Sequence, residues 1–113
     1  MPTPLNDWLR QQEPTNLTIT PHVGLLTLQF QLYGCSDLKE KRKVFNSLRQ
    51  TVGREPDLAI AETGDQDALD RATWTIAALG PSSQQIDQRL DQIEKMIAGR
   101  VDAPIIDVQR ERL

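Results

Sequence analysis

The chain has 113 residues, of which 38% are hydrophobic, 26% are charged and 4% are aromatic, and its formal net charge is -3. This length suits one domain with a mostly aliphatic core, and the mild acidity disfavours nucleic-acid binding over the whole surface while permitting a local basic patch. No apolar run reaches the roughly 20 residues of a membrane span, the N-terminus lacks a secretory pattern, and a single cysteine excludes an internal disulfide, so we expect a cytoplasmic protein with no membrane partner.

Residues 1–21 contain four prolines, which break up any long element. We therefore expect a proline-containing N-terminal extension over residues 1–21 and a single folded domain over residues 22–113. Within the extension, Asn6 is placed to cap a short helix that carries Trp8 and Leu9, and a mobile extension is the alternative.

Residues 22–33 alternate apolar and polar side chains, which predicts a half-buried strand that Gly34 ends. A helix then begins at Ser36 or Asp37, because Asp37 and Glu40 have the spacing of a capping box. Gly53 and the following Pro56 end this helix. Its apolar stripe consists of Leu38, Val44, Phe45, Leu48 and Val52.

The second half of the chain supplies two more strands, a helix and a last strand. Residues 57–63 and 71–80 read as strands joined by a turn-forming GDQD sequence. Ser82 and Gln85 resemble a capping box for a helix that ends at Gly99. The stripe of this helix is Ile86, Leu90, Ile93 and Ile97. Residues 103–113 predict the fourth strand, with Ile106 and Val108 facing inward.

The element order is strand, helix, strand, strand, helix, strand. This order predicts an α+β fold, the ferredoxin-like βαββαβ sandwich, with two helices on one face of a four-stranded antiparallel sheet. The open sheet face would carry Thr27, Gln29, Gln31, Tyr33, Ala59, Ala61, Thr73, Thr75, Ala77, Ile105, Asp107 and Gln109. Solvent or a second copy of the chain would cover this face, and we favour a homodimer because its apolar side chains gain little from facing water.

The first helix carries an unusual set of cations. Lys41 falls within its apolar stripe, where a buried ammonium is costly unless it is paired. Either its long stem lets the head reach solvent, or it pairs with Glu62 at the end of the second strand. The neighbouring cations form a ridge on the outer flank, although the helix dipole disfavours positive charge near an N-terminus. Phosphate binding or ordinary solvation would explain this ridge.

Three stretches of the chain resemble the YlxP-like family, a bacterial domain of unknown function. The resemblance covers about residues 22–110 and lies in Val23-Gly24, in Leu38-Lys39-Glu40-Lys41-Arg42, and in Ala61-Glu62 followed by Gln66-Asp67 and Arg71-Ala72. It implies a ferredoxin-like fold and genes often found among those for translation initiation and ribosome maturation, but no established activity. The chain departs from the family at Asp65, where the family often has His, and at Leu69, where it often has Trp.

Other candidate sites are weak. Cys35 and His22 flank one strand and would lie about 40 Å apart, which excludes a thiol–imidazole dyad within the chain. Asp65, Asp67 and Asp70 lack the glycine and the distant Glu of a calcium loop. The GPSS sequence before the second helix is better explained by capping than by phosphate binding.

The sequence thus supports two hypotheses, neither of which involves a catalytic residue, a metal or a cofactor that we can name. The first is a noncatalytic binding protein that contacts ribosomal RNA or a ribosomal subunit through phosphate. Its candidate residues are Lys39, Lys41, Arg42, Lys43 and Arg49. The alternative is a small dimeric ligand-sensing domain or enzyme with a polar site around Lys41, Glu62 and Arg71. The full polar cluster is Lys41, Glu62, Gln66, Asp67 and Arg71.

Overall fold

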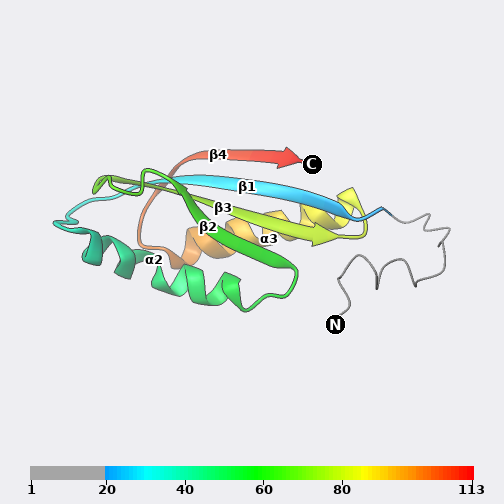
Figure 1. Ribbon diagram of the computed structural model, residues 1–113, viewed down its shortest axis with the longest axis horizontal. Helices are drawn as coiled ribbons and strands as arrows, with labels where there is room; N and C mark the ends of the chain where they lie inside the picture. Colours follow the sequence, from blue (N-terminus) through cyan, green and yellow to red (C-terminus); the bar gives the residue numbers. More distant parts are fainter. Residues whose placement is uncertain (1–19) are drawn as a thin grey trace, which may run out of the picture.

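A computed structural model describes residues 20–113 (Figure 1). Most of the expectations for the N-terminal extension, including a helix at Asn6, lie outside the described residues. The elements are β1 (His22–Gln31), α2 (Leu38–Gly53), β2 (Leu58–Gly64), β3 (Arg71–Gly80), α3 (Ser83–Arg100) and β4 (Ile105–Arg112).

The four strands form one antiparallel sheet in the order β2-β3-β1-β4. Helix α3 packs on β1 and β3, and α2 packs on β2 at one edge of the sheet (Figure 1). The predicted α+β ferredoxin-like fold is confirmed. Within the described part of the chain, neither helix is long and apolar enough to cross a membrane.

Both helices begin where their capping residues predict. The Asp37 carboxylate accepts the Glu40 backbone N–H at 2.8 Å, and the Glu40 carboxylate accepts the Ser36 N–H at 2.9 Å. The Ser82 hydroxyl accepts the Gln85 N–H at 3.2 Å in the same way. Because each side chain satisfies a backbone donor that a helix start leaves free, the local sequence defines both starts.

The core lies between the helices and the inner face of the sheet. Phe45 of α2 connects the two layers, since its ring centroid lies 5.1 Å from that of Phe30 and 5.4 Å from that of Trp74. The remaining core is mostly aliphatic, as the composition predicts. Its aliphatic members include Leu26, Leu28, Leu48, Ile76, Ile86, Leu90, Ile93 and Ile97.

The prediction for the fourth strand was wrong for Ile106, which was expected to face inward, and for Ile105, which was expected on the open sheet face. The pairing of β1 with β4 shifts between Gln29 and Phe30, so that Phe30 lies opposite Ile105 and Ile106 is the additional residue. Ile105 therefore packs against the core, whereas Ile106 is 50% exposed. Val108 lies opposite Leu28, on the expected side, but stays 41% exposed on this edge strand. A one-residue bulge reverses the face of the residues beyond it, and strict alternation does not reveal it.

Candidate functional site

Lys41 is the one charged side chain that is buried within residues 20–113, with 3% of its surface exposed. Its Nζ donates to the backbone oxygens of Asp65 at 2.6 Å and Ala68 at 2.7 Å, and lies 3.4 Å from the Gln66 oxygen. A Glu62 carboxylate oxygen lies 3.7 Å away, so the predicted pair with Glu62 is present. The ammonium is therefore enclosed and hydrogen-bonded by the turn after β2, and it does not reach the protein surface.

The same turn is held on its other side by Asp65, whose φ of 56° lies in the left-handed region that Asp tolerates better than most residues. Its carboxylate accepts hydrogen bonds from the Thr73 hydroxyl at 2.7 Å and from the Gln29 amide at 3.1 Å. These two bonds, with Thr73 as the larger cause, lower the pKa of Asp65 below its ordinary value. The turn is thereby fixed to β1 and β3 by one carboxylate and to α2 by one ammonium.

The free energy of unfolding should fall as the pH drops from about 5 to about 2. The folded-state pKa values of Asp65 and of Asp57, whose carboxylate accepts hydrogen bonds from Arg89, are lowered. The contribution of these two carboxylates to the free energy of unfolding is therefore complete above the ordinary Asp pKa of about 3.9 and is lost as the pH falls below it. Urea unfolding at several pH values should show that the free energy of unfolding depends less steeply on pH in Asp65→Asn than in the wild type. Asp102→Asn, at a position that forms no ion pair with a described residue, should follow the wild type. Equal slopes for both variants would contradict this assignment.

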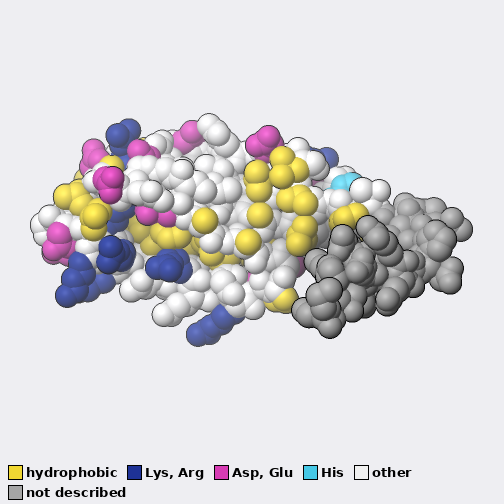
Figure 2. Space-filling view, viewed as in Figure 1, with side chains coloured by type: hydrophobic (Ala, Val, Ile, Leu, Met, Phe, Trp, Pro, Cys, Tyr) yellow, Lys and Arg dark blue, Asp and Glu magenta, His cyan; other side chains and the backbone are white. Residues whose placement is uncertain are grey.

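The outer flank of α2 carries a basic ridge, which we define as Lys39, Arg42, Lys43 and Arg49. All four side chains are exposed, and Figure 2 shows Lys and Arg side chains gathered over α2. None of the four forms an ion pair within 4.0 Å with a residue that the structure describes.

Three arginines outside the ridge differ from it in this respect. Arg89 pairs with Asp57 at 2.9 Å and with Glu55 at 3.3 Å. Arg110 pairs with Asp91 at 2.7 Å, and Arg112 pairs with an Asp of the same helix, α3. The positive charge of Arg89, Arg110 and Arg112 is thus compensated by the protein's own carboxylates, whereas that of the ridge is not compensated within the described chain.

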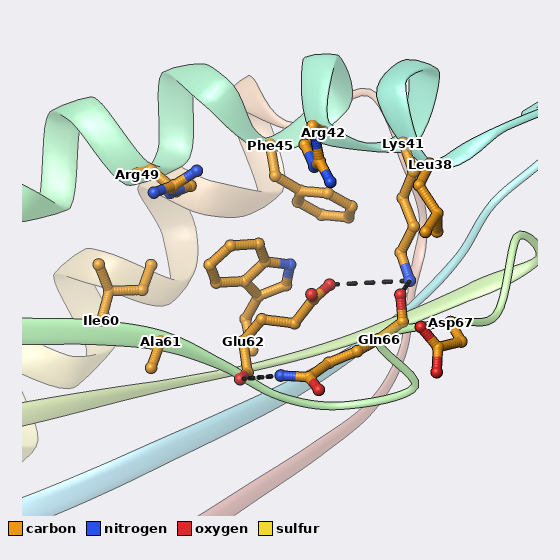
Figure 3. Close-up of a pocket in the computed structure, with 11 residues that line it drawn as sticks. Leu38, Lys41, Arg42, Phe45, Arg49, Ile60, Ala61, Glu62, Gln66 and Asp67 are labelled. Atoms are coloured by element: carbon orange, nitrogen blue, oxygen red, sulfur yellow. Dashed lines mark hydrogen bonds and ion pairs between the residues drawn. The ribbon is translucent and has the colours of Figure 1, made fainter.

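A cavity of about 540 Å³ lies between α2 and β2. Figure 3 shows Arg42, Phe45 and Arg49 on the α2 side. Ile60 and Glu62 face them from β2, whereas the side chain of Ala61 points away from α2. The complete lining is Leu38, Lys41, Arg42, Phe45, Arg49, Ile60, Ala61, Glu62, Gln66, Asp67 and Trp74. Two ridge residues, Arg42 and Arg49, and most of the polar cluster predicted from sequence therefore border one cavity, which we call the α2–β2 cavity.

The structure brings together most, but not all, of the predicted polar cluster. Lys41, Glu62, Gln66 and Asp67 line the α2–β2 cavity, whereas Arg71 does not and instead lies 3.8 Å from the Asp70 carboxylate. The apolar walls were not predicted as part of a site, because Phe45 and Trp74 read as ordinary core residues. Within the described residues, no group of three His, Cys, Asp or Glu side chains is placed to hold a metal.

Comparison with known proteins supports the resemblance noted in the sequence. A family model described as "Protein of unknown function (DUF503)" matches residues 23–110. The "Uncharacterized protein YlxP" of Bacillus subtilis (strain 168) is 30% identical over 71 residues, which are 63% of this chain and 77% of that protein. A crystal structure of a mutant of SnoaB, a cofactor-independent oxygenase from Streptomyces nogalater, covers 81% of this chain and 90% of its own at 11% identity. Its TM-score of 0.38 is too low to carry an argument.

Proposed function

This chain belongs to the DUF503 family of proteins of unknown function, and within that family we propose that it is a noncatalytic binding protein for ribosomal RNA or a ribosomal subunit. The observation that supports the proposal is that four exposed cations gather on one flank of α2 without a carboxylate partner among the described residues, whereas Arg89, Arg110 and Arg112 each have one. A ribosomal partner would make the cytoplasm its place of action.

The ridge has a shape that suits an extended polyanion. At about 100° and 1.5 Å per residue, its four side chains fall within an arc of about 120° and span about 15 Å along α2. Lys39 lies in the first turn, where the helix dipole makes a cation mildly unfavourable. Helix stability therefore does not explain its position, whereas contact with several phosphates does.

Binding to single-stranded RNA should depend steeply on salt. Four phosphate contacts predict a slope of about -3 in a plot of log affinity against log salt concentration. Reversing the charge of three ridge residues, in the triple variant Lys39→Glu, Arg42→Glu and Lys43→Glu, should weaken RNA binding at 0.1 M salt by about 100-fold or more. Fluorescence anisotropy of labelled RNA would measure both quantities, and gradient fractionation would test co-sedimentation with ribosomal subunits.

The matched control is the triple variant Arg54→Glu, Lys95→Glu and Arg100→Glu, which changes the net charge equally at exposed positions outside the ridge. It should bind RNA nearly as well as the wild type. Equal losses in the two triple variants would indicate that net charge alone acts, and would overturn the role of the ridge. Absence of both co-sedimentation and salt-dependent RNA binding would overturn the proposed function.

A second copy of the chain is our proposed partner for the open sheet face. The hydroxyl of Thr75 lies 2.9 Å from that of Thr27 and 2.8 Å from that of Thr63, so these polar groups already bond to one another. Exposed Ala59 and Ala61 lie beside them. Covering this face would therefore leave few hydrogen-bonding groups unsatisfied.

We expect sedimentation equilibrium to show a concentration-dependent dimer that Ala61→Lys dissociates, because an ammonium would lie within the proposed interface. Lys95→Glu, on α3 and away from this face, should leave the dimer intact. A wild-type chain that is monomeric at millimolar concentration would exclude this interface.

A further inference from the structure

Trp74 has an unusual environment for a buried indole. The residue is 7% exposed and lines the α2–β2 cavity, yet its Nε1 has no hydrogen-bond partner among the described residues. Buried Trp N–H groups usually find an acceptor, because an unsatisfied buried donor destabilises the fold. The wall of this cavity therefore contains an unsatisfied donor that neighbouring atoms cover, so an acceptor on a ligand reaches it only when the side chains around it shift.

Glu62 supplies the complementary group in the same cavity. Its carboxylate accepts no hydrogen bond from a described residue, and the nearest cation is Lys41 at 3.7 Å. Lys41 itself directs its shorter contacts to the oxygens of Asp65 and Ala68. The cavity thus offers a buried donor and a partly exposed acceptor.

The remaining lining selects for shape and charge. Phe45 and Ile60 provide apolar walls from α2 and β2, and Arg42 and Arg49 place two guanidinium groups on the α2 side (Figure 3). Planar guanidinium groups are well suited to phosphate and to the faces of flat rings. A volume of about 540 Å³ lies within the range of small-molecule sites, about 300–1,000 Å³.

We propose that the α2–β2 cavity binds a nucleotide. The base lies between the apolar walls, and the Glu62 carboxylate accepts from a base N–H. Once the side chains that cover it shift, the Trp74 Nε1 donates to an acceptor on the base edge. The phosphate meets Arg42 and Arg49. This site takes either a free mononucleotide or an unstacked nucleotide of single-stranded RNA, since proteins commonly hold splayed-out RNA bases against aromatic side chains.

This inference rests on the proposed function, because Arg42 and Arg49 belong to both the ridge and the cavity. It differs from that function in requiring a base as well as a phosphate. Trp74 makes the difference measurable. The full chain carrying Trp8→Phe has Trp74 as its only tryptophan, so its fluorescence reports on the cavity.

The experiment titrates this Trp8→Phe chain with the four ribonucleoside 5′-monophosphates and with a short single-stranded RNA. Ribose 5-phosphate and duplex RNA serve as control ligands, because the first has no base and the bases of the second are paired and stacked. We expect a saturable change in Trp74 emission with a mononucleotide or with single-stranded RNA, and none with the two control ligands. A response to mononucleotides identifies a free nucleotide as a ligand, whereas a response to single-stranded RNA alone identifies an RNA nucleotide.

Variants of the lining should separate base recognition from phosphate attraction. Glu62→Gln and Arg42→Ala should each raise the dissociation constant about tenfold, as expected for the loss of one charge-assisted hydrogen bond. Arg54→Ala, which removes an exposed cation outside the cavity, should leave the dissociation constant within twofold of the value for the Trp8→Phe parent. A urea unfolding curve for each variant confirms that it is folded at the temperature of the titration.

No saturable change with any nucleotide or single-stranded RNA, or an equal change with ribose 5-phosphate, would overturn the nucleotide site. Anisotropy of labelled RNA distinguishes this failure from failure of the proposed function. Salt-dependent RNA binding without a Trp74 response would leave the ridge as a phosphate-binding surface and remove the nucleotide site alone.

Discussion

Replacing Lys41 by methionine is expected to lower the free energy of unfolding by about 3–5 kcal/mol, the range seen when one partner of a buried charged pair is removed. Methionine has a similar length and fills the same apolar space, so packing changes little. The variant leaves the backbone oxygens of Asp65 and Ala68 without their donor and leaves the Glu62 carboxylate without its cation. Urea unfolding followed by circular dichroism would measure the change.

The control for this prediction is Lys39→Met, which makes the same chemical change two residues earlier on an exposed part of α2. Exposed substitutions of this kind usually change stability by no more than about 0.5 kcal/mol. A loss below about 1 kcal/mol for Lys41→Met would show that water satisfies the turn oxygens equally well. Lys41 would then not be the residue that fixes the turn to α2.

Truncating Phe45 to alanine should lower the free energy of unfolding by about 3–5 kcal/mol. Its side chain is fully buried and touches aromatic rings from two strands, Phe30 and Trp74. Removing the ring therefore forfeits apolar burial and leaves a void beside the α2–β2 cavity. Phe45→Leu should cost less, because leucine keeps part of the apolar contact.

The matched aromatic control is Tyr33→Ala, at a position that is 79% exposed. This variant should unfold within about 0.5 kcal/mol of the wild type. If Phe45→Ala and Tyr33→Ala had equal effects, α2 would not be anchored to the sheet through Phe45. The position of Arg42 and Arg49 relative to β2, on which the nucleotide site depends, would then lose its structural support.

Anchoring of α2 and exposure of its charge are linked. Phe45 holds the inner side of the helix against β1 and β3, and Lys41 holds it against the turn after β2. The ridge is the outer flank of that same helix. Because the inner contacts fix the rotation of the helix, they also fix which cations face solvent. Helix α3 has no comparable ridge, since Arg110 and Arg112 of β4 pair with its carboxylates.

The sequence alone determined the order and type of the elements, because each depends on short-range patterns. Period-two alternation identifies β1, and the stripes of α2 and α3 follow the helical repeat. Asp37 and Ser82 define the helix starts through bonds to residues three positions away. Such local signals need no knowledge of the rest of the chain.

Only the tertiary structure decided the details that concern function. Lys41 bonds to a turn 24 to 27 residues away, and sequence spacing could suggest Glu62 as a partner but not the backbone oxygens. The bulge that turns Ile106 outward, the distance of Arg71 from the cavity and the unpartnered Trp74 Nε1 are equally invisible in the sequence. Each depends on how separate elements pack, because long-range contacts set strand register and the partners of buried polar groups, whereas neighbouring residues set only the local conformation.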